Sequence, residues 1–179
     1  MDLRTKKTLR SIKTAFFHLR EQKPLERITV KELVEAAEIS KATFYLHYRD
    51  IYDLSNQLQQ ALIREILDSI PREDAIKDPE VYMGGIFQSF VSRREQILIL
   101  FDRSGSNVLP AAIDSALKDS ICQHRPELRQ NVQFQVSLTY QIYGAYYAFI
   151  EHNKRFRNSA ILDVVMEQQK QAHGWFQAL

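Results

Sequence analysis

The sequence predicts an all-α protein of about nine helices, and three observations support this prediction. Apolar residues recur at three- and four-residue spacing in almost every segment, as they do on one face of an α-helix. Side chains that cap helices stand before several of these segments, and prolines separate them. No segment makes a convincing strand. The chain has 179 residues, of which 45% are hydrophobic, and this is enough to bury a core.

Two helices are expected near the start of the chain. An apolar stripe predicts a helix over residues 4–22, which Pro24 ends. The stripe consists of Leu9, Ile12, Phe16 and Leu19. Thr29 and Glu32 have the spacing of a capping box, in which the hydroxyl accepts from the backbone N–H of Glu32 and the carboxylate reaches back. This second helix is short and ends near Ala37.

The third and fourth helices also begin at capping residues. Ser40 is the candidate N-cap of a helix that extends to about His47. Asp50, followed by Asp53, marks the start of a long fourth helix that ends near Ile70.

Five more helices are expected in the rest of the chain. They begin near Pro79, contain residues 97–101, extend from Pro110 to about Gln123, and cover residues 131–152 and 159–177. The apolar residues 97–101 could also form a strand, but helix-forming residues flank them on both sides. Residues 103–107 are expected to form a loop.

The composition excludes several classes of protein. Cys122 is the only cysteine, so neither an intramolecular disulfide nor a cysteine-based zinc site can form. No apolar run approaches the length of a transmembrane helix, and the charged N-terminus lacks the apolar segment of a signal peptide. We therefore expect a cytoplasmic protein that has no bound cofactor or metal.

Basic residues are concentrated at the N-terminus. Lys and Arg total 24 and Asp and Glu total 22, which gives a net charge of +2. Residues 1–20, however, contain six basic residues and only Asp2 as an acidic one. A basic segment on a nearly neutral chain suggests an anionic partner, although a solvated helix face produces the same pattern.

Residues 28–54 carry the strongest functional signal. Two short helices separated by Glu38, Ile39 and Ser40 form a helix-turn-helix, whose second helix fits the major groove of duplex DNA. The apolar positions that would join this unit to the first helix are Val30, Leu33, Val34, Ala37, Ile39 and Phe44. The side chains that remain outward are candidates for contacts with DNA.

The outward side chains suit a nucleic-acid surface. Lys41 can donate to phosphate or guanine, the methyl groups of Ala42 and Thr43 can contact a thymine methyl, and the Thr43 hydroxyl can bond to a base edge. Further donors to phosphate are the helix N-terminus at Thr29 and the side chains of Tyr45, His47 and Tyr48. Packing is the alternative role of the aromatic side chains, and short helix pairs also occur in proteins that bind no nucleic acid.

Residues 1–55 closely resemble the DNA-binding domain of the tetracycline-repressor (TetR) family of bacterial regulators. The matching stretches are Ile28–Leu33, Ala37–Tyr45, His47–Tyr48 and Leu54. The resemblance implies that the helix from Ser40 to His47 is the recognition helix. It also implies phosphate contacts by Thr29, Tyr45 and Tyr48.

Two positions depart from the family pattern. The family usually has glycine where this chain has Glu38, at a turn that often needs a positive φ, so either Glu38 is strained or the turn differs. The family often has a phosphate-binding lysine where this chain has Ile51, and Arg49 is the candidate to replace that contact. The DNA-binding domain is expected over residues 1–50.

The resemblance implies a helical domain for dimerisation and ligand binding over residues 51–179. The helix over residues 132–151 is apolar on more than one face, so a partner subunit could cover it, and the last two helices would form a four-helix homodimer interface. The alternative is that these helices form only the monomer core. The aromatic residues that could line an effector pocket, or simply pack, are Tyr82, Phe87, Phe90, Phe101, Tyr140 and Tyr143.

The sequence therefore favours a homodimeric regulator that binds a pseudo-palindromic operator in double-stranded DNA. A repressor released by a small-molecule effector is the first hypothesis, and an activator or co-regulator of the same fold without a ligand is the alternative. A helical module that binds RNA or a membrane through its basic first helix is less suitable, because the apolar stripe of that helix is needed in the three-helix head. No catalytic motif is present, so we do not expect an enzyme.

Overall fold

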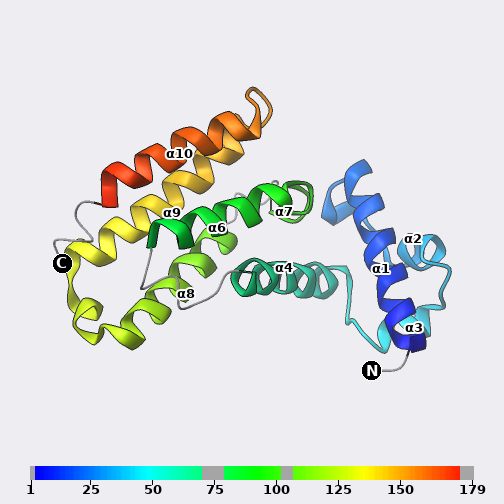
Figure 1. Cartoon of the computed structure of the whole chain (residues 1–179). Coiled ribbons are helices and arrows are strands. Elements are labelled where there is room, and N and C mark those ends of the chain that lie inside the picture. Colours follow the sequence, from blue (N-terminus) through cyan, green and yellow to red (C-terminus); the bar gives the residue numbers. More distant parts are fainter. Residues whose placement is uncertain (1–2, 70–78, 102–106, 174–179) are drawn as a thin grey trace. The chain divides into compact units, whose positions relative to one another are not determined.

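The computed structural model of the protein describes residues 3–69, 79–101 and 107–173 (Figure 1). These residues form nine α-helices and contain no strand, which confirms the predicted all-α fold. The helices are α1 (Leu3–Gln22), α2 (Val30–Ala36), α3 (Lys41–Tyr45), α4 (Ile51–Asp68), α6 (Pro79–Ser92), α7 (Arg94–Phe101), α8 (Val108–His124), α9 (Val132–His152) and α10 (Asn158–His173), and short 3-10 helices cover Leu25–Arg27 and Pro126–Gln130.

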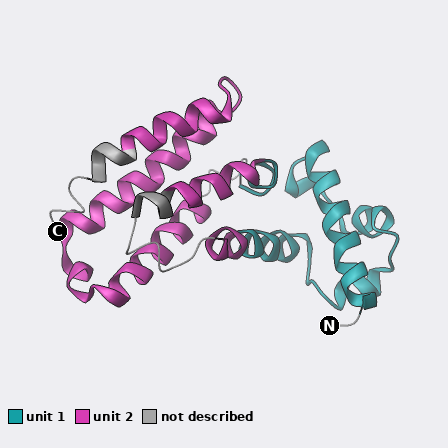
Figure 2. Ribbon diagram, viewed as in Figure 1, with its two compact units in different colours: residues 1–62, 95–104 teal, residues 63–94, 105–179 magenta. Residues whose placement is uncertain are grey.

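The chain divides into two compact units (Figure 2). Unit 1 contains residues 1–62 and 95–104, and unit 2 contains residues 63–94 and 105–179. Helix α4 is shared, since its first part belongs to unit 1 and its last part to unit 2. The expected boundary at residue 50 concerns function rather than contacts, and it stays a prediction.

Unit 1 has a small apolar core formed by α1, α2 and α3. Phe16, Leu33 and Phe44 are fully buried, and Ala15 joins the predicted stripe of α1. The expected core positions that are only half-buried are Leu9, Val30 and Ile39. One buried aromatic ring from α1 and one from α3 therefore hold the helix-turn-helix against the first helix.

Side-chain caps begin α2, α3 and α4 as the sequence predicts. The hydroxyl of Thr29 accepts from the backbone N–H of Glu32, and the Glu32 carboxylate accepts from the backbone N–H of Thr29 at 3.0 Å. This is the predicted capping box. Ser40 Oγ accepts from the backbone N–H of Thr43 at 3.0 Å, and Asp50 caps α4 in the same way.

Helix α3 is shorter than expected, because it ends at Tyr45 and not near His47. The N–H of Leu46 still donates to the carbonyl of Ala42 in the helical pattern. The next two N–H groups both donate to the carbonyl of Phe44, at 2.9 and 3.0 Å. The tighter bond from His47 turns the chain out of the helix.

Residues 97–101 lie in α7, so the prediction of a helix rather than a strand is confirmed. The last carbonyls of α7 accept hydrogen bonds from other helices of unit 1. Arg20 Nη2 donates to the carbonyl of Ile99 at 2.7 Å, and Gln59 Nε2 donates to that of Leu100 at 2.8 Å. Carbonyls at a helix C-terminus lack partners within the helix, so these bonds fasten α7 to α1 and α4.

Aromatic packing forms the core of unit 2. Phe149 of α9 is fully buried, and its ring centroid lies 4.8 Å from that of Phe90 and 6.1 Å from that of Phe87, both of α6. Tyr146 meets Phe90 edge-on at 5.8 Å. Helices α9 and α10 pack side by side (Figure 1).

Two expectations lie partly outside the described residues. The expected loop over residues 103–107 is one of them, since only residue 107 is described. The last helix was expected to extend to residue 177, and its described part ends at His173. Helix α8 begins at Val108, two residues before the expected start at Pro110.

Candidate nucleic-acid interface

The outer face of α3 is exposed as predicted. Lys41 and Ala42 are exposed, Tyr45 has 56% of its surface exposed, and Phe44 points into the core. Leu46 is 80% exposed, although it is not among the residues predicted to face DNA. Its apolar character alone suggests a core residue, so only the structure reveals it as part of this face.

Thr43 is half-buried and engaged with the cap of α3. Its backbone N–H donates to Ser40 Oγ, and the two hydroxyl oxygens lie 2.9 Å apart in a hydrogen bond. The Thr43 hydroxyl is therefore already partnered before any base edge approaches. Its methyl group keeps the predicted ability to contact thymine.

Tyr48 and His47 are half-buried beside this face. The ring centroid of Tyr48 lies 5.6 Å from that of Phe44 and 6.3 Å from that of His47. Burial, with a smaller effect of the Asp53 carboxylate, raises the pKa of the Tyr48 phenol. The phenol therefore stays protonated at neutral pH and can donate to a phosphate oxygen while its ring packs.

The N-terminus of α2 is already occupied by a carboxylate. Glu32 accepts from the backbone N–H and from the hydroxyl of Thr29, and it forms an ion pair with Lys23. Hydrogen bonds from Lys23 and then from Thr29 lower the pKa of Glu32 to about 2. Thr29 is exposed, but a phosphate at this helix end would have to compete with Glu32 for the backbone N–H groups.

The turn of the helix-turn-helix contains Glu38 in the left-handed region, with φ of 55°. The N–H of Ile39 donates to the carbonyl of Val34 at 3.0 Å, and the N–H of Glu38 donates to that of Glu35 at 3.3 Å. This pair of bonds is a Schellman motif, which normally places glycine at the left-handed position. The sequence left open whether Glu38 is strained or the turn differs from that of the family. The structure contains the usual turn with a strained Glu38.

Ile51, the second departure from the family pattern, begins α4, and Arg49 stands two residues before it. Ile51 is buried, with 4% of its surface exposed, so it has no access to a phosphate. Arg49 is exposed, and its backbone N–H donates to Asp53 Oδ2 at 2.9 Å. That bond fixes the backbone of Arg49 between α3 and α4.

Basic side chains are exposed along α1. Arg4, Lys6, Lys7 and Arg10 are exposed. Lys7 and Arg10 also line an open groove between α1 and the end of α2, which Glu38 borders. These cations lie beside the turn of the helix-turn-helix, where they add attraction for a phosphate backbone.

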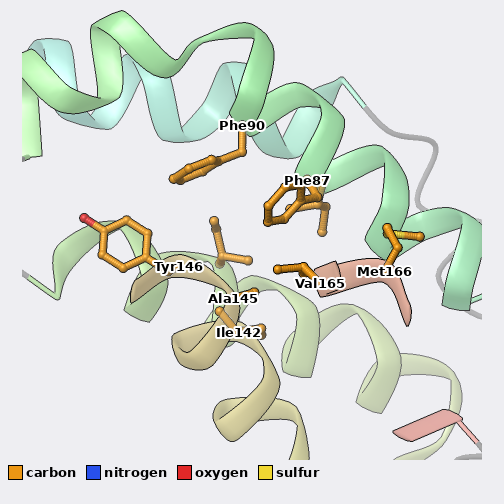
Figure 3. A pocket seen from close by; sticks show the side chains of 9 residues that line it. Phe87, Phe90, Ile142, Ala145, Tyr146, Val165 and Met166 are labelled. Carbon is orange, nitrogen blue, oxygen red and sulfur yellow. The ribbon is translucent and has the colours of Figure 1, made fainter. Parts of the chain in front are cut away.

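Unit 2 encloses a small apolar cavity between α6, α8, α9 and α10 (Figure 3). Its volume is about 40 Å³. The lining residues are Ile86, Phe87, Phe90, Ile113, Ile142, Ala145, Tyr146, Val165 and Met166. No charged side chain is among them, and burying an unpaired charge is costly, so the cavity suits a neutral apolar molecule.

The structure places the predicted pocket residues in three different environments. Phe87 and Phe90 line the cavity. Phe101 is buried in unit 1 instead, because α7 packs there. Tyr82 lies in α6, but its side chain lies outside the described residues.

Tyr140 and Tyr143 require a correction, because they line an open groove between α9 and α10 and not the cavity. Tyr140 is 78% exposed. The positions of α9 that face the cavity are Ile142, Ala145 and Tyr146, which lie on one face of the helix, and the helical period turns the other tyrosines outward. The side-chain amide nitrogen of Gln141, also at this groove, is buried without a hydrogen-bond partner among the described residues.

Within residues 3–69, 79–101 and 107–173, no three His, Cys, Asp or Glu side chains gather as metal ligands would. Cys122 is buried. None of the described helices is long and apolar enough to cross a membrane.

The comparison with protein families agrees with the geometry of unit 1. Residues 15–58 match the family described as bacterial regulatory proteins, tetR family. The match includes all of α2 and α3, with parts of α1 and α4. A comparison with curated proteins gave no match. The helix-turn-helix and the family match agree on a DNA-binding domain of the TetR type within residues 15–58, which indicates a DNA-binding transcriptional regulator.

Proposed function

We propose that the chain is a homodimeric, sequence-specific repressor that a small-molecule effector releases from its operator. The exposed face of α3, anchored from within by Phe44, is the observation that carries this proposal. Two such helices about a two-fold axis would read half-sites separated by about one helical turn of DNA, roughly 34–36 Å. The proposed contacts are Thr29, Lys41, Ala42, Thr43, Tyr45, His47, Tyr48 and Arg49.

Binding to DNA is tested by gel shifts with an operator selected from random duplexes and with a scrambled control. Tyr48→Phe removes a phosphate donor, so we expect binding to weaken about five-fold on both DNAs. Thr43→Ala removes a methyl group that faces the bases, so we expect a changed base preference instead. Equal losses for both variants on both DNAs would refute the assignment of these roles.

Dimerisation is proposed through α9 and α10. The outer face of these helices exposes a run of apolar side chains, and the inner face already forms the core of unit 2. The exposed positions are Val136, Tyr140, Tyr147 and Val164. A Cβ atom built on Gly144 would meet nothing within 4 Å, so this side of α9 leaves room for close approach of a second helix. A partner subunit would also supply an acceptor for the amide of Gln141.

Light scattering at decreasing protein concentration tests the dimer. We expect Tyr140→Glu to shift the protein to monomers, because it places a charge in the apolar groove. Phe156→Glu is the matched control, since Phe156 is 51% exposed and lies outside the lining of the groove. A dimer that tolerates Tyr140→Glu as well as Phe156→Glu would contradict the proposed interface.

The effector is proposed to enter the apolar cavity. Its lining favours a small neutral molecule, and Met166 is a long, adaptable side chain that can move to enlarge the space. Ala145→Phe should fill the cavity and abolish any shift in melting temperature that small apolar molecules produce in the parent protein.

The alternative is a regulator of the same fold without a ligand, and the small size of the cavity favours it. A volume of about 40 Å³ is well below the roughly 150 Å³ that holds benzene in an engineered cavity. Reporter expression after deletion of the gene separates the two signs of regulation, because expression rises if a repressor is lost and falls if an activator is lost.

A further inference from the structure

We infer that Leu46 determines part of the operator sequence by contacting the C5 methyl group of thymine. The inference rests on the proposed binding of α3 in the major groove. It adds a residue that the sequence analysis did not select, and it specifies the chemistry of the DNA: a T·A pair opposite Leu46 in each half-site.

The first argument is the exposure of Leu46. Three other large apolar side chains of residues 28–54, Leu33, Phe44 and Leu54, are 0% exposed. Leu46 is 80% exposed. It therefore adds nothing to the core of unit 1, and burying it against an apolar group of a partner is favourable.

The second argument is the direction of the backbone at Leu46. This residue is the C-cap of α3, with φ of −68° and ψ of −22°, and its N–H donates to the carbonyl of Ala42 at 3.2 Å. Its geometry is still helical, so its side chain lies on the same face as that of Ala42, one turn earlier. Ala42 is exposed as well.

The third argument is the chemistry of this face. The hydroxyl of Thr43 is hydrogen-bonded to Ser40, so Ala42, Thr43 and Leu46 together present mainly methyl groups. In the major groove, the thymine methyl is the apolar group that a base pair offers, and the other recognition groups are hydrogen-bond donors and acceptors. A leucine can neither donate nor accept, so a contact with phosphate is unsuitable for it.

The test uses the full-length protein and synthetic operators in which uracil replaces thymine. Uracil keeps the base pairing and removes only the methyl group. At one thymine in each half-site, we expect uracil to weaken binding of the parent protein about four-fold, the factor that burial of one methyl group supplies. For the thymine opposite Leu46, Leu46→Ala should bind the thymine and uracil operators with equal affinity, whereas any thymine that Ala42 or Thr43 contacts should stay sensitive.

Tyr52→Ala is the matched control, because Tyr52 is 59% exposed on α4, outside the α3 face. It should keep the preference for thymine over uracil. Leu46→Met should also keep it, since methionine retains apolar reach.

The outcomes separate this inference from the proposed function. If no duplex is preferred over any other, the proposed sequence-specific binding fails. If an operator is selected but every thymine that is sensitive in the parent protein stays equally sensitive in Leu46→Ala, or if no thymine is sensitive, then binding stands and the role of Leu46 is overturned. Because Leu46 is exposed, its substitution leaves the core of unit 1 intact.

Discussion

Local polar caps supplement the apolar core in the helix-turn-helix of unit 1, whereas aromatic packing over long sequence distances joins α9 to α6 in unit 2. In the first, polar bonds join residues three apart, as in the cap between Ser40 and Thr43. In the second, Phe149 packs against Phe87 and Phe90, which are distant in sequence. Short polar bonds orient individual side chains, whereas apolar packing places whole helices. Substitutions of buried aromatic residues should therefore cost more stability than changes at caps and turns.

The two regions also differ in how they expose apolar groups. On α3, Leu46 stands among lysine, hydroxyl and phenol groups, a mixture that suits DNA. On α9, Val136, Tyr140 and Tyr147 form a continuous face that suits another helix. The exposure of an apolar side chain does not by itself indicate which partner it binds. The chemistry of the neighbouring side chains indicates whether that partner is DNA or another helix.

The largest expected effect is that of Phe149→Ala in unit 2. The side chain is fully buried in an aromatic cluster, so the variant should lose about 3–5 kcal/mol of unfolding free energy, as measured in urea. Phe156→Ala removes an exposed ring and should stay within about 0.5 kcal/mol of the parent protein. Similar losses for both variants would show that the aromatic cluster does not dominate the stability of unit 2.

Arg20→Met tests the polar attachment of α7 in unit 1. It removes the charged donor to the carbonyl of Ile99 and leaves an end of α7 without that partner, so we expect a loss of about 2 kcal/mol. Arg10→Met changes an exposed arginine of the same helix and should have little effect on urea unfolding. If Arg20→Met is as stable as Arg10→Met, water replaces the hydrogen bond to the carbonyl of Ile99 without loss of stability.

Thr29→Ala removes the capping hydroxyl of α2. The expected loss of unfolding free energy is about 1 kcal/mol, since the N–H of Glu32 loses its acceptor. Thr29→Ser keeps the hydroxyl and should retain most of the stability. Thermal unfolding of the three proteins measures the difference, and an unchanged melting temperature for the alanine variant would contradict the role of the cap.

Glu38→Gly should stabilise the protein by about 0.5–1 kcal/mol, because glycine adopts the left-handed φ of 55° without strain. Glu35→Gly is the matched control within helix α2, where glycine should instead cost about 1 kcal/mol. A gain in unfolding free energy for Glu38→Gly together with a loss for Glu35→Gly would confirm the turn geometry. A loss at both positions would argue against it.

The smallest expected effect is the pH dependence contributed by Glu32. Its pKa is about 2 in the folded protein, below the ordinary 4.5. The stabilisation is therefore fully present above about pH 4.5 and is lost as the pH falls toward about 2. Glu32→Gln should be less stable than the parent protein at neutral pH, and the difference should shrink in acid. A difference that does not depend on pH would contradict the ionic origin of the effect.

The parts of the fold that were predicted correctly depend on near neighbours in the sequence. Thr29, Ser40 and Asp50 cap their helices as expected, because each bond spans three residues. The strain at Glu38 was one of two alternatives, and the hydrogen bonds of the turn decide it. The helix α3 was predicted too long, since nothing in the sequence after Tyr45 marks its end.

The sequence by itself determined the all-α class, the helix-turn-helix and its caps, because periodicity and capping act within a few residues of the chain. Only the tertiary structure decided that Leu46 faces outward, that Tyr140 lies on a groove rather than in a cavity, and that Arg20 holds α7. These features depend on which distant helix covers each face. That choice is made by the packing of the whole chain, and no local pattern records it.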